Sequence, residues 1–223
     1  MQFCYAQDVR TRFPQLCSRV VLVSGIRPNA DPAAEIGRLT RIADQRLATA
    51  SEGELPEIQA WRRAFSAMGY KPTQYRCASE ALLRRYRKEG ALPPLHPLID
   101  LCNAASLAFA IPVAVFDAAR ISGAMTVRPA IGDEVYATFG GEIEHPEPGE
   151  IIFADDSGRA HARRWTNRQS GWSAIRPDTT QALIVVEALH ETASADAAAL
   201  IASLDAALTA IWTNAAVIGV DPQ

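Results

Sequence analysis

The sequence predicts an α+β protein in which residues 1–223 form a single compact domain. Segments with apolar residues at helical spacing lie in the first half of the chain and near its C-terminal end. The middle third instead holds short β-branched runs separated by turn residues. Neither an internal repeat nor a low-complexity linker divides the chain. Helices that are segregated from a run of strands are typical of the α+β class.

The N-terminal part is predicted to hold one strand and two helices. The strand is the β-branched run VVLVSGI at residues 20–26. After it, Asp31 and Pro32 are suited to the N-cap and the first position of a helix. A second helix is predicted for ELPEIQAWRRAFSAMG at residues 54–69, because its apolar residues form one stripe and Gly69 ends the pattern.

Two further helices and a strand are predicted next. Ser79 is expected to cap a helix that ends at Gly90. The segment PLIDLCNAASLAF at residues 97–109 is apolar on nearly all sides, which is typical of a buried helix. IPVAVFD at residues 111–117 follows as a strand.

The middle third is predicted to be rich in strands. GAMTVRPA at residues 123–130 and EVYATF at residues 134–139 are short strands. Residues 149–165 are predicted to form a hairpin whose turn is Asp-Ser-Gly at residues 156–158. QALIVVEAL at residues 181–189 is the last predicted strand.

A C-terminal helix is predicted for about residues 195–212, with apolar residues on one face. Ser194 or Asp196 is expected to cap it. The last ten residues are expected to fray, because chain ends are poorly ordered unless they are held by packing.

Composition and charge limit the function classes. The chain is 48% hydrophobic and carries a formal net charge of −3, so any contact with nucleic acid must come from a local basic patch. Four cysteines without a CxxC pair, no secretory signal and no apolar run of about 20 residues lead us to expect a cytoplasmic protein with no membrane span.

The sequence lacks the usual signatures of metal and cofactor sites. The four histidines have no metal-ligand spacing, and the cysteines form no cluster that supports them. No glycine-rich dinucleotide fingerprint, phosphate loop or serine-hydrolase elbow is present. We therefore expect neither a metal nor a cofactor.

The segment RRWTNRQS at residues 163–170 is too polar to cover a core with either strand face. Glu187 ends the apolar run ALIVVE and shares a strand face with Leu183 and Val185. An unpaired buried carboxylate is costly. Either this strand end is open to water, or a cation from residues 163–170 meets the carboxylate.

The second alternative gives a specific hypothesis for a small-molecule site. Arg164 or Arg168 pairs with Glu187, which forms the polar floor of a cleft. Trp165 is a wall of this cleft, and Asn167 and Gln169 supply hydrogen bonds. Such a site suits an aminoacyl ester, a free amino acid or a related metabolite. The alternative is a structural arginine–carboxylate network without a ligand.

Two other polar groups stand out. Asp100 and Asn103 lie three positions apart in the apolar segment 97–109 and therefore face the same way. They either form a structural network or, through Asn103, contribute to substrate binding. A basic cluster lies on one predicted helix. This cluster is either a solvated face or a surface that binds RNA phosphates. Its members are Arg84, Arg85, Arg87 and Lys88.

An ordered series of short motifs resembles a known family. HPLIDLCNAASLAFAIPVAVFD, GAMTVRPA, GDEVY, EPGEIIFADDSG and TTQALIVVEA are similar to the B3/B4 domain, the editing domain of the phenylalanyl-tRNA synthetase beta subunit. The similar core runs from about Trp61 to Glu187, and residues 20–60 and the helix at about 195–212 flank it. The resemblance implies a β-sandwich of unusual topology with helices packed outside.

The resemblance also implies hydrolysis of the ester that joins a wrong amino acid, tyrosine in the family, to the phenylalanine tRNA. Glu187 matches a carboxylate of the family's editing pocket, whereas a pocket histidine of the family falls on Ala114. Residues 163–170 replace the family's glycine-rich segment. In this hypothesis Glu187 holds the amino group or the water, and Arg168 or Asn167 steadies the ester.

The leading functional prediction is therefore a protein that binds tRNA and hydrolyses a mischarged aminoacyl ester in trans. Two alternatives remain at this point. One is an RNA-binding module without catalysis, which uses the basic cluster. The other is a binding protein for a small amino-acid-like ligand.

Overall fold

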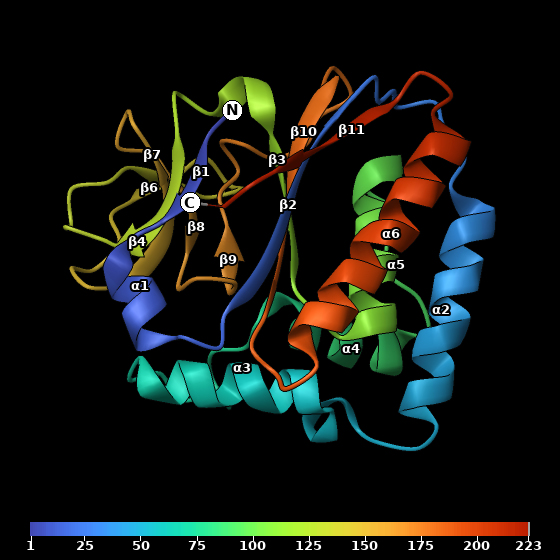
Figure 1. The fold of residues 1–223 in the computed structure, drawn as a ribbon, viewed down its shortest axis with the longest axis horizontal. Helices are drawn as coiled ribbons and strands as arrows, with labels where there is room; N and C mark the ends of the chain where they lie inside the picture. Colours follow the sequence, from blue (N-terminus) through green and yellow to red (C-terminus); the bar gives the residue numbers. More distant parts are fainter. Residues whose placement is uncertain (223) are drawn as a thin grey trace.

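Two β-sheets packed face to face form the centre of the molecule in the computed structural model, which describes residues 1–222 (Figure 1). The five-stranded sheet contains, in spatial order, β1 (Phe3–Tyr5), β4 (Met125–Pro129), β7 (Ile151–Asp155), β8 (Ala160–Arg163) and β9 (Arg168–Gln169). The four-stranded sheet contains β11 (Ala216–Val220), β2 (Cys17–Ser24), β10 (Gln181–Ala188) and β3 (Val113–Asp117). The predicted α+β sandwich with helices outside is confirmed.

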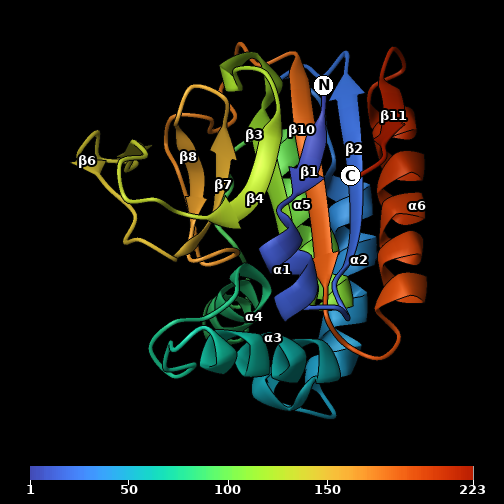
Figure 2. The same cartoon turned by 60° about the vertical axis from the view of Figure 1, so that its left-hand side comes forward.

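The helices surround this sandwich. They are α1 (Gln7–Arg12), α2 (Ala33–Leu47), α3 (Pro56–Ala67), α4 (Ala78–Glu89), α5 (Pro97–Phe109) and α6 (Ala193–Ile211), with short 3-10 turns at Glu52–Glu54 and Ala118–Arg120. Helices α2, α5 and α6 cover the outer face of the four-stranded sheet, and α3 and α4 lie across one end of the sandwich (Figure 1). A separate hairpin of β5 (Tyr136–Ala137) and β6 (Ile143–Glu144) projects beyond β8, on the side of the molecule opposite to α6 (Figure 2).

Strand β10 is the central strand of the four-stranded sheet and is buried on both faces. Its side chains alternate between two apolar clusters. Leu183 and Val185 face the other sheet, whereas Ile184 and Val186 face the helices. A strand that is covered on both sides must be apolar throughout, which explains its continuous run of β-branched residues. By the same alternation, Glu187 faces the interior of the sandwich, as predicted.

Several predicted element ends differ from the observed ones. Cys77, not Ser79, is the residue that precedes α4, and the Ser79 hydroxyl instead lies 3.4 Å from the Cys77 sulfur in the protein interior. Thr192 precedes α6 in place of Ser194 or Asp196. A polar residue near a helix start is a cap only when its backbone is non-helical, and sequence alone does not specify that conformation.

Both chain ends are more ordered than predicted. The last ten residues include β11, which pairs with β2 from Ala216 to Val220. Near the other end, β1 pairs in parallel with β4, with Phe3 opposite Met125. Strands this short carry little periodicity, and their partners lie far away along the chain, so neither was recognisable from local pattern.

Helix α6 is an exception to the expectation that the chain holds no apolar run of about 20 residues. With 19 residues and a mean hydropathy of 1.4, it is long and apolar enough to cross a membrane by length and composition alone. The buried helices of soluble proteins pass the same criterion. Leu200, Leu204 and Leu208 of α6 are buried in the cluster that also contains the outer face of the four-stranded sheet.

We expect the packing of β1 to be essential for stability. Phe3 is 0% exposed and its ring lies 5.3 Å from that of Tyr5. Phe3→Ala is predicted to lower the free energy of unfolding by about 3–5 kcal/mol, measured by urea denaturation. Phe139→Ala is the matched control, because Phe139 is 75% exposed and its loss is expected to change stability by about 0.5 kcal/mol or less. Equal effects of the two variants would contradict the docking of β1.

Candidate functional site

The turn between β8 and β9 forms one wall of the site. Arg164 and Trp165 have φ values of 46° and 58°, a left-handed conformation that costs non-glycine residues about 1–2 kcal/mol each. The Trp165 side chain is fully buried between Phe13 and Trp61, each with its ring centroid 4.9 Å away. Burial of a large aromatic side chain is worth enough to offset this strain.

Glu187 lies at the end of β10 and is only 1% exposed. Its Oε1 accepts hydrogen bonds from the Tyr5 hydroxyl at 2.7 Å and from Trp165 Nε1 at 2.8 Å. Its Oε2 receives no hydrogen bond from residues 1–222. One carboxylate oxygen is therefore committed to the fold, and the other is available to a ligand or to water.

The environment of Glu187 changes its acidity. Burial raises the pKa of Glu187 to about 7, although the hydrogen bonds from Trp165 and Tyr5 act in the opposite direction. Burial, and then the negative charge of Glu187, also raise the pKa of Tyr5 well above its ordinary value. A carboxyl group that titrates near neutral pH is suited to accept or donate a proton during a reaction.

The predicted pairing of Glu187 with Arg164 or Arg168 is wrong. Arg168 pairs with Glu144, with Nη1 and Oε2 2.9 Å apart. Arg164 places its guanidinium over the Tyr75 ring, 4.9 Å from the centroid. Neutral donors replaced the expected cation, since two hydrogen bonds and a pKa that burial raises to about 7 reduce the need for a positively charged partner.

Arg163, the remaining arginine of this turn region, is also occupied. It is buried and donates to both carboxylate oxygens of Glu150, from Nε and Nη2, at 2.9 Å each. Its Nη1 also contacts Glu144. The bidentate pair holds β8 against the loop before β7. The polar stretch that looked like a ligand-binding surface is thus partly a structural ion-pair network.

A cavity of about 70 Å³ nevertheless brings most of the predicted site residues together. Its lining includes Glu187, Trp165, Asn167, Arg168 and Gln169. Arg164, which was predicted to bind substrate, is not part of this lining. We call this space the Glu187 cavity.

The two amide side chains of the Glu187 cavity are anchored through their nitrogens. Asn167 Nδ2 donates to the Arg76 carbonyl at 2.8 Å, and Gln169 Nε2 donates to the Val115 carbonyl at 2.7 Å. No group among residues 1–222 donates to their side-chain oxygens. The cavity therefore offers hydrogen-bond acceptors, whereas its one cation, Arg168, is already paired.

Sequence reasoning missed two residues of this site. Tyr5 lies 182 positions from Glu187, and no local pattern connects the two. Thr166 lines the Glu187 cavity, and its hydroxyl is buried without a hydrogen-bond partner among the described residues. Such an unsatisfied group is rare and indicates a site for water or ligand. Thr166 lies inside the polar segment 163–170, and this position was the signal that could have identified it.

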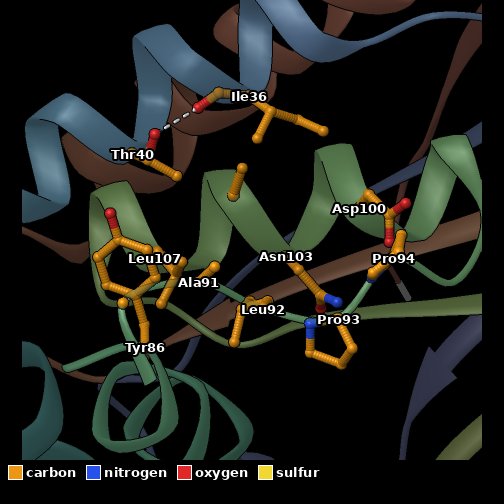
Figure 3. Close-up of a pocket in the computed structure, with 12 residues that line it drawn as sticks. Ile36, Thr40, Tyr86, Ala91, Leu92, Pro93, Pro94, Asp100, Asn103 and Leu107 are labelled. Carbon is orange, nitrogen blue, oxygen red and sulfur yellow. Dashed lines mark hydrogen bonds between the residues drawn. The ribbon is translucent and has the colours of Figure 1, made fainter. Parts of the chain in front are cut away.

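Asn103 lies elsewhere, which corrects its predicted place in the Glu187 site. Together with Asp100 it lines a separate groove of about 300 Å³ between α2, α5 and the loop at residues 90–94 (Figure 3). Helix α5 places both side chains on this surface because they are three positions apart.

The basic cluster on α4 is largely paired with carboxylates. Arg84 and Arg87 both contact the buried Glu52, at 3.3 and 2.9 Å. Arg85 pairs with Glu89 at 2.9 Å, one helical turn away. Lys88 forms no ion pair within residues 1–222. Each of the three arginine side chains is still about half exposed, so contact with RNA phosphates stays a prediction.

One group of potential metal ligands is present among the described residues. Ligand atoms of Glu57, His190 and Asp196 lie within 4.8 Å of one another. Glu57 already pairs with Arg46 at 2.6 Å, and His190 Nε2 lies 2.8 Å from Asp196 Oδ2. Since these internal partners compensate the charges, we assign no metal here, and the expected absence of metals and cofactors stays a prediction.

A Ser–His–Asp chain is also present but lies in the protein interior. His161 Nδ1 is 2.8 Å from the Ser173 hydroxyl, and its Nε2 is 3.2 Å from Asp155 Oδ2. All three residues are buried, and none lines either cavity described above. Asp155 also accepts bonds from the turn at Ser157. A nucleophile must reach its substrate, so we interpret this chain as structural.

Comparison with known proteins identifies the family. Residues 60–207 match the B3/4 domain family. The chain belongs to the B3/4 domain family. This B3/4 protein is also similar to an N-terminal fragment of the phenylalanyl-tRNA synthetase beta-subunit from Pyrococcus horikoshii, with a TM-score of 0.52 and 12% identity. The similarity covers 97% of this chain and 50% of that one, so the B3/4 protein spans half the length of its structural neighbour. No curated protein matches the sequence significantly.

These comparisons confirm the predicted family and fold. At 12% identity the structural similarity supports the fold alone. The family assignment itself rests on the match of residues 60–207 to the B3/4 domain.

The raised pKa of Glu187 predicts a pH-dependent stability. Between the ordinary pKa of 4.5 and about 7, the unfolded chain is ionised at this group while the folded chain keeps its proton. The stability that the neutral form contributes is fully present below pH 4.5 and is lost as the pH rises through 7. The loss amounts to about 3 kcal/mol.

Glu187→Gln lacks this titration but keeps an oxygen that can accept from Tyr5 and Trp165. The free energy of unfolding of the variant, relative to the native protein, is therefore expected to rise by about 3 kcal/mol between pH 4.5 and pH 8. Urea denaturation across this range measures it. The exposed Glu191→Gln is the control, for which no such trend is expected. A pH-independent difference for Glu187→Gln would contradict the neutral, buried carboxyl group.

Proposed function

We propose that this B3/4 protein hydrolyses the ester bond of a mischarged aminoacyl-tRNA in trans. The observation that carries the proposal is the Glu187 cavity, in which a carboxyl group with one free oxygen lies beside acceptor oxygens of two amides. The relation to a tRNA synthetase domain supports tRNA as the partner.

The acceptor-rich cavity favours an aminoacyl ester over a free amino acid. The α-ammonium group of an aminoacyl ester donates hydrogen bonds, and the side-chain oxygens of Asn167 and Gln169 are free to accept them. A free amino acid also carries a carboxylate, which needs a cation or several donors. Arg168 is neutralised by Glu144, so that requirement is poorly met.

The chemistry requires little machinery, because an aminoacyl ester is already activated. Glu187 Oε2 accepts a proton from a water molecule as the water oxygen attacks the ester carbonyl. The tetrahedral intermediate then expels the ribose oxygen, which receives the proton back from Glu187. Arg168 stays paired with Glu144 and steadies the ester, which is neutral and needs no compensating charge. The Thr166 hydroxyl lines the same cavity without a hydrogen-bond partner among the described residues, and in this mechanism it holds the water or the developing oxyanion.

The size of the Glu187 cavity indicates the class of amino acid. A volume of about 70 Å³ is well below the ~300–1,000 Å³ of ordinary small-molecule pockets. This space accepts a short side chain and excludes an aromatic ring. We therefore propose a small amino acid on the tRNA, in place of the tyrosine that the family resemblance implies.

A deacylation assay tests this mechanism. With tRNA that carries alanine or serine, the B3/4 protein is expected to release the amino acid above the spontaneous rate. Glu187→Gln is expected to lower the rate by about 10²-fold or more, because general base catalysis contributes about 10²–10⁴-fold. Thr166→Val, which removes only the hydroxyl, is expected to lower it at least tenfold.

Phe139→Ala is the control for this assay, because Phe139 is exposed and lies outside the cavity lining. A tyrosyl-tRNA substrate is expected to be hydrolysed more slowly than the small aminoacyl esters. If no ester is hydrolysed above background, or if Glu187→Gln is as fast as the native protein, the proposed hydrolysis is lost.

The proposed tRNA contact on α4 needs variants that do not disturb folding. Removal of Arg84 or Arg87 would take away one of the two cations that compensate the buried Glu52, which is costly. Arg85 and Lys88 avoid this problem, since Arg85 pairs only with the half-exposed Glu89. The double variant Arg85→Gln/Lys88→Gln is therefore the suitable test.

The double variant is expected to bind tRNA more weakly and to reduce the slope of log affinity against log salt by about 1–2, since each lost phosphate contact lowers it by about 0.9. Filter binding at salt concentrations from about 50 to about 200 mM measures this slope. An unchanged slope would exclude α4 as the RNA surface. If the native protein binds tRNA with the expected salt dependence but hydrolyses no ester, the non-catalytic RNA-binding function is favoured.

A further inference from the structure

The groove between α2, α5 and the 90–94 loop is a space that the proposed hydrolysis does not use. Its volume of about 300 Å³ lies at the lower limit for small-molecule sites. None of its lining residues also lines the Glu187 cavity, so the two spaces are separate.

Most of the groove is apolar. Ile36 of α2, Leu107 of α5 and Leu92 of the loop line it, and Pro93 and Pro94 follow Leu92 along the rim (Figure 3). The two prolines have no backbone N–H, so this part of the loop offers a ligand carbonyl oxygens and apolar surface. The body of a ligand in this groove is therefore expected to be an apolar ring or chain.

Two polar side chains project from α5 into the same groove (Figure 3). The amide of Asn103 makes no hydrogen bond with any of residues 1–222, although it is half-buried in an otherwise apolar helix. Asp100 uses Oδ1 to accept from the Leu95 backbone at 2.9 Å, and its Oδ2 accepts from no described residue. Polar groups in such surroundings are normally satisfied, so both point to a ligand or ordered water.

The charged groups around the groove determine whether a cationic or an anionic ligand is favoured. Asp100 is its only ionisable lining residue apart from Tyr86, which donates to the carboxylate of Asp44 at 2.8 Å. No lysine, arginine or histidine of the described chain lines the groove. One lining carboxylate, without a cation among the described lining residues, favours a positively charged group.

We propose that this groove binds a small primary amine that has an apolar body and no carboxylate. Its ammonium group donates to Asp100 Oδ2 and to the side-chain oxygen of Asn103. Its ring or branched chain packs against Ile36, Leu92 and Leu107. This site does not depend on the proposed hydrolysis, because it shares no residue with the Glu187 cavity.

Binding of phenethylamine to the full chain tests the proposal. Titration calorimetry is expected to give saturable binding, and the thermal midpoint is expected to rise with phenethylamine concentration. 3-Phenylpropionate, which has a similar body and an anionic head, is expected to bind at least tenfold more weakly.

Two variants locate the amine. Asp100→Asn keeps the oxygen that accepts from Leu95 but removes the charge, and is expected to weaken phenethylamine binding about tenfold or more, as loss of a hydrogen bond to a charged group does. Asn103→Leu removes the amide at similar volume and is expected to weaken it by about fivefold. Asp178→Asn makes the same charge change at an exposed residue outside the groove and is expected to leave affinity unchanged.

Circular dichroism and the thermal midpoint of each unliganded variant establish that it is folded. The proposal is overturned if phenethylamine does not bind, if 3-phenylpropionate binds equally well, or if folded Asp100→Asn binds with native affinity. It is also overturned if Glu187→Gln abolishes amine binding while Asn103→Leu retains it, because the amine would then occupy the Glu187 cavity.

Discussion

The buried carboxyl group of Glu187 joins three parts of the fold that are distant in sequence. It lies on the central strand of one sheet and accepts hydrogen bonds from Tyr5, on an edge strand of the other, and from Trp165 in the β8–β9 turn. Tyr5 and Trp165 are themselves part of the apolar cluster between the sheets. The raised pKa of Glu187 and the left-handed backbone of Arg164 and Trp165 both depend on this arrangement. Burial in the closed sandwich causes the first and offsets the strain of the second.

The arginines near this site have a structural role that changes the character of the cavity. Arg163 binds Glu150 in the interior, and Arg168 binds Glu144 at its edge. The cavity consequently presents acceptor oxygens instead of free cations. The groove beside α5 has the same polarity, because Asp100 and Asn103 line it without a cation. Both spaces are therefore suited to positively charged groups, and they differ in size by a factor of about four.

Local sequence signals predicted most of the helices and strands but missed the strands at the two chain ends. The apolar run that becomes β10 and the uniformly apolar α5 are recognisable because burial on all sides leaves few polar residues. The strand at residues 3–5 and the strand at residues 216–220 were missed, since each is held by partners far away in sequence. The resemblance to the B3/4 family did not supply these two strands, because its similar core, from about Trp61 to Glu187, lies between them.

The sequence by itself determined which side of the sheet Glu187 faces, because strand side chains alternate, and it singled out residues 163–170 because their polarity is unsuited to a core. Only the tertiary structure decided what surrounds that carboxyl group. Tyr5 reaches it from the other end of the chain, while the nearby arginines are closer to other glutamates. Partner choice among several charged groups depends on distances and burial in three dimensions, and a one-dimensional pattern contains neither.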